Sequence, residues 1–161
     1  MRRKVTVIFK ADRISSIVAS AAFAALLGCG ASVARAGLGD TISPGATGLT
    51  VREARPAYTM VEQTDPTSGA TVDQYVATGS GQVFAIAWSG PHRPSLNALF
   101  SSYFGAYTDA LAKSRMHSLH VVHIDTGSVV VDMSGHPGDF RGYAWAPPLV
   151  PSGVDISTLI R

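Results

Sequence analysis

The sequence predicts an α+β domain in which an antiparallel sheet of about six strands packs on one long amphipathic helix, in the order βββ-α-βββ. Two observations support this prediction. Short strand-like stretches lie on both sides of residues 95–111 and are separated by turns rich in Gly, Pro, Asp and Ser. Within residues 95–111, the apolar positions instead recur at the period of a helix.

Three strands are expected before the helix, at residues 57–63, 71–78 and 82–88. The cluster at residues 64–69 provides the first turn, and the glycines within residues 79–81 supply the positive φ angles of a tight hairpin. Apolar side chains occupy both faces of the third strand, so we expect this strand in the centre of the sheet.

A helix is predicted to begin after Ser95, because a serine hydroxyl at that position accepts hydrogen bonds from free backbone N–H groups. Its apolar stripe consists of Leu96, Leu99, Phe100, Tyr103, Phe104, Tyr107 and Leu111. Its opposite face is small and nearly uncharged, and consists of Ala98, Ser101, Ser102, Gly105, Ala106 and Asp109. This second face fits either close packing on neighbouring elements or a contact surface for a partner.

Three further strands are expected after the helix, at residues 119–124, 128–133 and 140–146. Residues 125–127, Asp-Thr-Gly, join the first two of these strands. Two prolines end the last strand, because proline has no N–H to donate to a neighbouring strand.

The chain begins with the three parts of a secretory signal: a basic start, an apolar stretch at residues 14–27, and an Ala-x-Ala site that ends at Ala36. The apolar stretch is shorter than the roughly 20 residues of a membrane-spanning helix. We therefore expect cleavage between Ala36 and Gly37, and export to the periplasm or beyond the cell. The expected organisation is a signal peptide at 1–36, a flexible lead-in at 37–54 and a single α+β domain at 55–161.

A second route of maturation stays open. Residues 26–29, Leu-Leu-Gly-Cys, resemble the lipobox of bacterial lipoproteins, in which the cysteine is acylated and becomes the new N-terminus. An acylated Cys29 would make the protein a membrane-anchored lipoprotein, and membrane contact is expected only in that case.

The charge of the chain depends on the signal. Removal of residues 1–36 takes away six of the 13 basic residues and one of the 11 acidic ones, which leaves a net charge of −3 before histidine. Nucleic-acid binding is therefore not expected, because it requires a basic surface. Cys29 is the only cysteine, so the mature chain forms no disulfide within itself.

Two motifs suggest a catalytic site or a metal site, but a simpler structural interpretation fits each of them better. Residues 125–128 spell the Asp-Thr-Gly-Ser motif of aspartic proteases, whose mechanism needs two aspartates that share a proton. The chain has one copy, and Asp and Gly are ordinary hairpin residues, so a turn is the favoured interpretation. His117, His120 and His123 do not converge as metal ligands on a strand, although His123 shares a face with Asp125. We predict no catalytic residue, no metal site and no cofactor.

Two stretches, at residues 83–104 and 140–154, together with Gly37-Leu38-Gly39, resemble a family of exported proteobacterial proteins catalogued as domain of unknown function 2844. The resemblance covers most of the mature chain. It implies export, a single domain and a mature chain that begins near the Leu-Gly pair. It implies no reaction and no site residues.

The sequence favours a non-enzymatic periplasmic binding or assembly module, whose partner is another protein or a cell-envelope ligand. A candidate contact surface consists of Trp88, Arg93, Arg141 and Trp145, because Trp and Arg are common at contact hot spots. The simpler interpretation places both tryptophans in the core. The alternative function is a small periplasmic hydrolase whose site has no recognisable motif.

Overall fold

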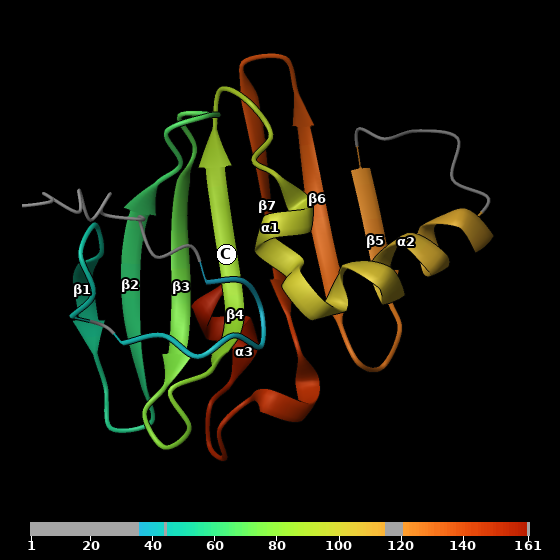
Figure 1. Ribbon diagram of the computed structural model, residues 1–161. Coiled ribbons are helices and arrows are strands. Elements are labelled where there is room, and N and C mark those ends of the chain that lie inside the picture. Colours follow the sequence, from blue (N-terminus) through green and yellow to red (C-terminus); the bar gives the residue numbers. More distant parts are fainter. Residues whose placement is uncertain (1–35, 44, 115–120, 161) are drawn as a thin grey trace, which may run out of the picture. The chain divides into compact units, whose positions relative to one another are not determined.

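Two strand meanders meet in the centre of one antiparallel sheet, in the spatial order β1-β2-β3-β4-β7-β6-β5 (Figure 1). The computed structural model describes residues 36–43, 45–114 and 121–160. The strands are β1 (Thr50–Ala54), β2 (Tyr58–Thr64), β3 (Thr71–Ala77), β4 (Val83–Gly90), β5 (Val121–Asp125), β6 (Val130–His136) and β7 (Asp139–Trp145). The helical segments are α1 (Leu96–Phe100), η1 (Ser101–Tyr103), α2 (Phe104–Lys113), η2 (Pro147–Leu149) and α3 (Ile156–Leu159).

The predicted fold class is confirmed. The six expected strands are β2 to β7, and the expected helix is the run α1-η1-α2 between β4 and β5. As predicted, β4 is central, because it pairs with β3 on one side and with β7 on the other. The helical run then carries the chain across the sheet to β5 at the far edge. No helix within the described ranges is long and apolar enough to cross a membrane.

Residues 37–54, expected as a flexible lead-in, contribute to both the sheet and the core. Leu38 and Ile42 are buried, and the segment ends in the edge strand β1. The sequence does not indicate this role, because the segment is rich in Gly, Thr and Pro and has no periodic apolar pattern. Leu38 and Ile42 are instead held by backbone hydrogen bonds to Leu99 and Gly81. Charged side chains on β1 are typical of an edge strand that is protected from further pairing.

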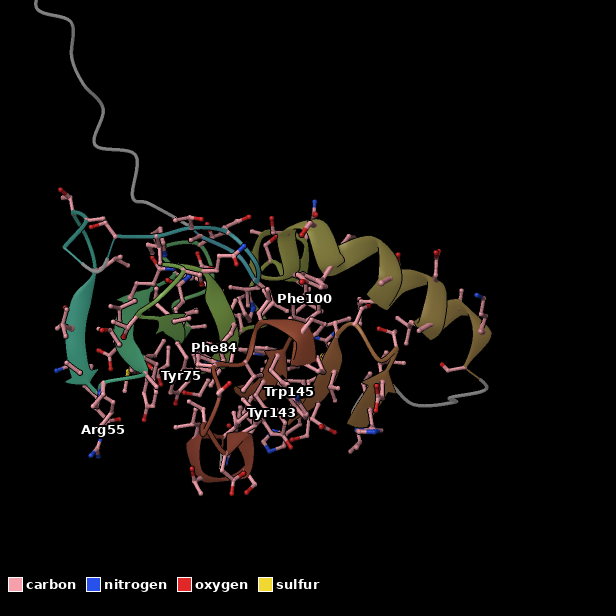
Figure 2. All side chains as sticks on the ribbon, turned by 90° about the horizontal axis from the view of Figure 1, so that it is seen from below. Arg55, Tyr75, Phe84, Phe100, Tyr143 and Trp145 are labelled. Atoms are coloured by element: carbon pink, nitrogen blue, oxygen red, sulfur yellow. The ribbon has the colours of Figure 1, made fainter. Side chains whose placement is uncertain are left out.

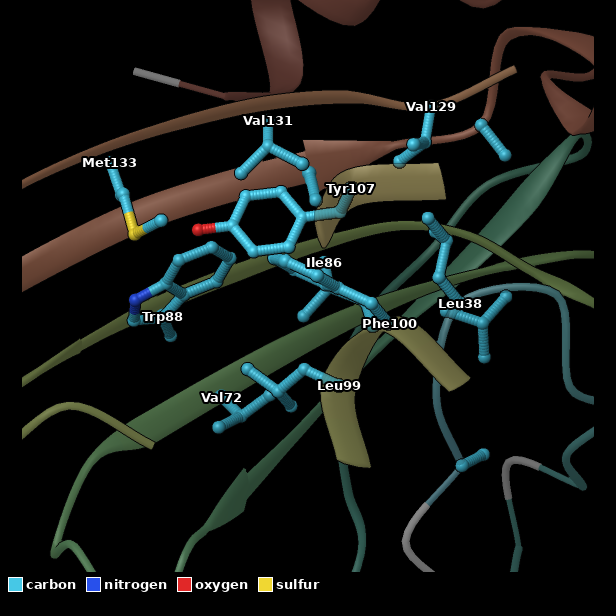
Figure 3. Packing of buried hydrophobic residues seen from close by; sticks show 14 of the residues in the cluster. Leu38, Val72, Ile86, Trp88, Leu99, Phe100, Tyr107, Val129, Val131 and Met133 are labelled. Atoms are coloured by element: carbon cyan, nitrogen blue, oxygen red, sulfur yellow. The ribbon is translucent and has the colours of Figure 1, made fainter. Parts of the chain in front are cut away.

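The main core lies between the helical run and one face of the sheet (Figure 3). Phe100 is fully buried, and its ring centroid lies 5.9 Å from that of Trp88 on β4 and 5.1 Å from that of Tyr107 on α2. The sheet residues beneath these rings include Val72, Ile86, Val131 and Met133. Burial of rings of this size supplies much of the free energy that holds the helix on the sheet.

The helical run is interrupted at Ser101, which has a φ of 45°. Ser95 occupies the expected N-cap position, although its side chain makes no capping hydrogen bond. The small face of the first turn packs on the N-terminal segment: a Cβ added at Gly37 would lie 2.5 Å from the carbonyl oxygen of Ala98. Close packing is therefore the correct interpretation for this part of the small face, whereas Gly105 and Asp109 are exposed.

The second face of the sheet is covered over part of its area by the C-terminal segment, residues 147–160. Tyr58, Tyr75 and Phe84 form an aromatic cluster there, with ring centroids 5.9 to 6.2 Å apart. The Tyr75 hydroxyl donates a hydrogen bond to the carbonyl oxygen of Leu159 at 3.0 Å and ties the segment to the sheet. Figure 2 shows Tyr75 and Phe84 on the side of the sheet opposite Phe100.

The Asp-Thr-Gly sequence forms the predicted turn between β5 and β6. The Asp125 carboxylate accepts a hydrogen bond from the Gly127 N–H at 2.8 Å, and the Thr126 N–H donates to the carbonyl oxygen of Val129. Gly127 has a φ of 75°, a conformation that costs little only for glycine. The aspartate therefore has a local structural role in this turn.

The turn predicts a ranking of two substitutions. Gly127→Ala should lower the free energy of unfolding by roughly 1–2 kcal/mol, because alanine is strained at positive φ. Asp125→Asn should change it by less than ~1 kcal/mol, because asparagine accepts the same backbone hydrogen bond. Urea denaturation of both variants measures the ranking. A larger loss for Asp125→Asn than for Gly127→Ala would contradict the turn assignment.

Candidate binding groove on the second sheet face

One row of polar side chains crosses the second face of the sheet. Residues paired directly across antiparallel strands point to the same face. The pairings Glu62↔Asp73, Asp73↔Ala87, Ala87↔Tyr143, Asp132↔Tyr143 and His123↔Asp132 continue from one strand to the next. The row therefore consists of Glu62, Asp73, Ala87, Tyr143, Asp132 and His123, from β2 to β5.

An open groove of about 610 Å³ lies over the middle of this row. Its lining includes Asp73, Ala87, Ser89, Asp132, Arg141 and Tyr143, and Ile160 of the C-terminal segment also borders it. The small side chain of Ala87 lies between Asp73 and Tyr143 in the row and makes the surface hollow at that point. The volume falls in the range of roughly 300–1,000 Å³ that is typical of small-molecule sites.

Asp73 is a carboxylate in the groove, and one of its two oxygens has no hydrogen-bond partner among the described residues. Its Oδ1 is buried and has no partner among the described residues. Burial raises the pKa of Asp73, and the nearby Glu62 carboxylate raises this pKa further, while Arg52 lowers it. The Arg52 guanidinium is engaged with Glu62, with which it forms a hydrogen-bonded ion pair. Ionised Asp73 is thus unfavourable in the folded protein.

The other charged groups of the row have partners. Asp132 accepts a hydrogen bond from His123 Nδ1 at 2.6 Å, and the His123 side chain is 64% exposed. Burial raises the pKa of Tyr143, and the Asp132 carboxylate beside it contributes to the same rise. At the border of the groove, Arg141 donates to both carboxylate oxygens of Asp139, at 2.8 and 3.0 Å.

The four residues predicted as a contact surface do not gather on one face. Trp88 is 4% exposed and packs in the main core, as the simpler interpretation predicts. Trp145 lies on the opposite face, half-buried, with its ring stacked on Tyr143 at 5.8 Å between centroids (Figure 2). Arg93 lies over the ring of Phe140, at 5.6 Å from its centroid. Trp88 and Arg141 both border the groove, and of these two residues Arg141 has its side chain on the second face.

The remaining predicted positions are distributed as follows. Ala36 and Gly37 begin the described part of the chain, whereas Cys29, His117 and His120 lie outside it. His123 is bonded to Asp132 on the neighbouring strand rather than to Asp125 on its own strand. Across residues 36–43, 45–114 and 121–160, no group of three or more His, Cys, Asp or Glu residues is arranged to hold a metal ion.

Sequence reasoning missed the polar row. Its members come from six strands, and their alignment depends on the strand register, which the sequence pattern does not specify. The available signal was a single acidic residue in each of two strands, Asp73 in β3 and Asp132 in β6. Such a residue must either face solvent or line a site.

The fold and the groove define an α+β protein with a seven-stranded antiparallel sheet, one face of which carries the helical run and the other an open polar groove. The family model described as "Protein of unknown function (DUF2844)" matches residues 23–159, and the chain belongs to this family. No curated protein and no solved structure gives a significant match.

The environment of Asp73 predicts a stabilising substitution. Because its folded-state pKa is raised, Asp73 contributes most to stability when it is protonated, below about pH 4, and this contribution is lost as the pH rises through the raised pKa. Asp73→Asn should therefore raise the melting temperature at pH 7, by about 3–5 °C, and the gain should shrink towards pH 4.

Asp132→Asn provides the matched control on the same row. Asp132 has His123 as a hydrogen-bond partner, so this substitution should not stabilise the protein. Thermal unfolding of both variants between pH 4 and pH 8 gives the measurement. An equal gain in both variants, or a gain for Asp73→Asn that does not depend on pH, would show that Asp73 carries no unfavourable charge.

Proposed function

We propose that this protein is a non-enzymatic binding module of the cell envelope, which holds a cationic group of its ligand in the groove. The observation that carries the proposal is Asp73, which lines the groove while its Oδ1 has no hydrogen-bond partner among the described residues. A buried polar atom left in this state costs folding free energy. Such unfavourable groups concentrate at functional sites, where a ligand supplies the missing partner.

The charge arrangement supports a ligand with one positive group. Glu62 pairs with Arg52, and Asp132 pairs with His123, which leaves the Asp73 carboxylate for an external cation. An ammonium or guanidinium group in the groove would balance the charge of Asp73, and rotation of the buried carboxylate about its Cβ–Cγ bond would present Oδ1 to the donors of that group. The net charge of −3 expected for the exported chain also favours the approach of a cation.

Aromatic surface near Asp73 supports the same ligand chemistry. Tyr143 lies two strands away in the row, and only Ala87 separates the two side chains. A cation beside Asp73 would lie near an aromatic ring, and contacts between cations and aromatic rings are favourable. The volume of about 610 Å³ leaves room for an aliphatic arm that carries the charge. A lysine side chain of an envelope peptide and a free polyamine share this chemistry.

The proposal predicts binding of a lysine probe. In an NMR titration, N-acetyl-lysine methylamide should shift the amide resonances of β3, β4 and β7, with a dissociation constant on the order of 1–10 mM, as expected for a single charged contact. The same probe with an acetylated Nε should not bind, because its charge is removed. Spermidine, titrated in parallel, distinguishes a free polyamine from a peptide side chain by which of the two binds more tightly.

Two protein variants complete this test. Asp73→Asn should weaken binding of the probe at least about tenfold, the effect of losing roughly 1.4 kcal/mol. Asp139→Asn, which removes the exposed carboxylate bonded to Arg141, is the matched control and should leave binding unchanged. Equal shifts with the charged and acetylated probes, or binding unaffected by Asp73→Asn, would refute the proposed site.

The alternative is a small hydrolase, and one observation bears on it. The bond of 2.6 Å between Asp132 and His123 is the arrangement of a carboxylate that orients a general base. Among the described residues, no serine or threonine hydroxyl is hydrogen-bonded to His123, which makes binding the better supported function. Generic esterase, phosphatase and peptidase substrates test the alternative. Turnover by the purified protein that is abolished in His123→Ala would establish hydrolysis in place of simple binding.

A further inference from the structure

The predicted cleavage point lies where the described part of the chain begins. Ala36 and Leu38 are buried, with 8% and 0% of their surface exposed. The Leu38 N–H donates to the carbonyl oxygen of Leu99 at 2.7 Å, and the Gly39 N–H donates to that of Val83 at 2.8 Å. Residues immediately after the Ala36–Gly37 bond are therefore fixed by both the helical run and the sheet.

A carboxylate is held against the nitrogen of Gly37. The Gly37 N–H donates a hydrogen bond to Asp40 Oδ2 at 2.8 Å, in a partly buried position. The other oxygen, Asp40 Oδ1, accepts a hydrogen bond from the Ser101 hydroxyl, also at 2.8 Å. Both oxygens of Asp40 are thus engaged, and one of them is directed at the atom that becomes the α-amine if the chain is cut before Gly37.

The space around Gly37 admits no side chain. A Cβ at this position would lie 2.5 Å from the carbonyl oxygen of Ala98 and 2.6 Å from Cβ of Ser101. In the described part of the chain, Ser101 is the one non-glycine residue with a positive φ, which is 45°. Strain of this kind persists where the surrounding structure requires it, and here it accompanies the hydrogen bond to Asp40.

A buried amide with an open acceptor lies beside the same peptide bond. Gln74 is fully buried; its Nε2 donates to the carbonyl oxygen of Ala36, and its Oε1 has no hydrogen-bond partner in the described structure. The Ala36 oxygen and the Gly37 nitrogen belong to one peptide group, so the Gln74 amide is adjacent to both. A buried acceptor without a donor is costly, and a new donor at this position would remove the cost.

We propose that this cluster is a binding site for the protein's own new N-terminus, the α-ammonium group of Gly37 produced when the export machinery's leader peptidase hydrolyses the Ala36–Gly37 bond. Water supplies the oxygen of the carboxylate that leaves on Ala36 and a proton for the Gly37 nitrogen, and at neutral pH the amine takes a second proton from solvent. The hydrogen bond to Asp40 then becomes charge-assisted and stronger. The ammonium group has three donors. Cleavage also removes the Ala36 oxygen that accepts from Gln74 Nε2, which frees the Gln74 amide to rotate and present Oε1 to one of these donors.

The geometry also fixes the order of events. In the folded domain Ala36 is buried and its carbonyl oxygen is hydrogen-bonded, so a peptidase cannot reach the bond. Hydrolysis must therefore precede folding of this segment, and the ammonium group docks as the domain folds. The lipoprotein route gives a different result, because a chain that begins at Cys29 keeps a neutral amide at Gly37.

The test uses the full chain, exported from a Gram-negative host with its own leader and recovered in its processed form. The Lys113→Arg background makes the α-amine the only amine in the mature chain, because the other two lysines lie in the leader. Intact mass first identifies the terminal residue, and we expect Gly37. The protein is then acetylated in urea and refolded, which removes the charge of the α-amine.

Thermal unfolding is measured for the free and the acetylated protein, first with Asp40 intact and then in the Asp40→Asn variant. With Asp40 intact, acetylation should lower the melting temperature by about 4–8 °C, whereas in Asp40→Asn it should change it by less than half as much. If Asp40→Asn does not fold, Ser101→Ala replaces it; this variant keeps the carboxylate but not its hydroxyl partner, and should show an intermediate loss. A terminus at acylated Cys29, an uncut chain, or equal losses with and without Asp40 would overturn the proposal.

Discussion

The aromatic contact of Phe100 with Trp88 and Tyr107 joins the helical run to the sheet, and the rest of the structure depends on it. Because β4 pairs with β7, the chain must leave the centre of the sheet after β4 and return at the far edge in β5. The helical run makes this connection and covers the sheet where it passes (Figure 1). Beyond it, the same face is closed by Leu38 and Ile42, so the N-terminal segment is a necessary part of the core.

The groove lies on the second face of the sheet, which few elements of the described chain cover. A seven-stranded sheet has two faces, and a single long helical run covers only one of them. On the second face, the C-terminal segment covers the aromatic cluster of Tyr58, Tyr75 and Phe84, and its Ile160 borders the groove. Polar residues occupy the neighbouring row because apolar side chains there would be exposed to water.

The sequence predicted those elements whose signal is local. Alternation and helical period located six strands and the helical run, because each element carries its own pattern of burial. Leu38 and β1 escaped prediction, since one apolar residue among glycines has no period. The burial of Leu38 depends on backbone hydrogen bonds far along the chain, from Leu38 to Leu99 and from Gly39 to Val83. The groove escaped for a related reason. Asp73 and Asp132 meet in one row only through the pairing of β4 with β7, and register between distant strands is not encoded in either strand alone.

Asp40 and Asp73 differ in how far hydrogen bonds within the chain account for them. Both oxygens of Asp40 accept hydrogen bonds from the chain itself, from Gly37 and from Ser101, so its presence is explained by folding. Among the described residues, Asp73 Oδ1 has no hydrogen-bond partner, and Glu62 of the same charge lies nearby, so contacts within the described chain give no reason for an aspartate there. A residue that costs stability and lines a groove is best explained by something that arrives after folding. Contacts within the chain therefore account for Asp40, whereas Asp73 is the carboxylate on which the proposal of a bound ligand rests.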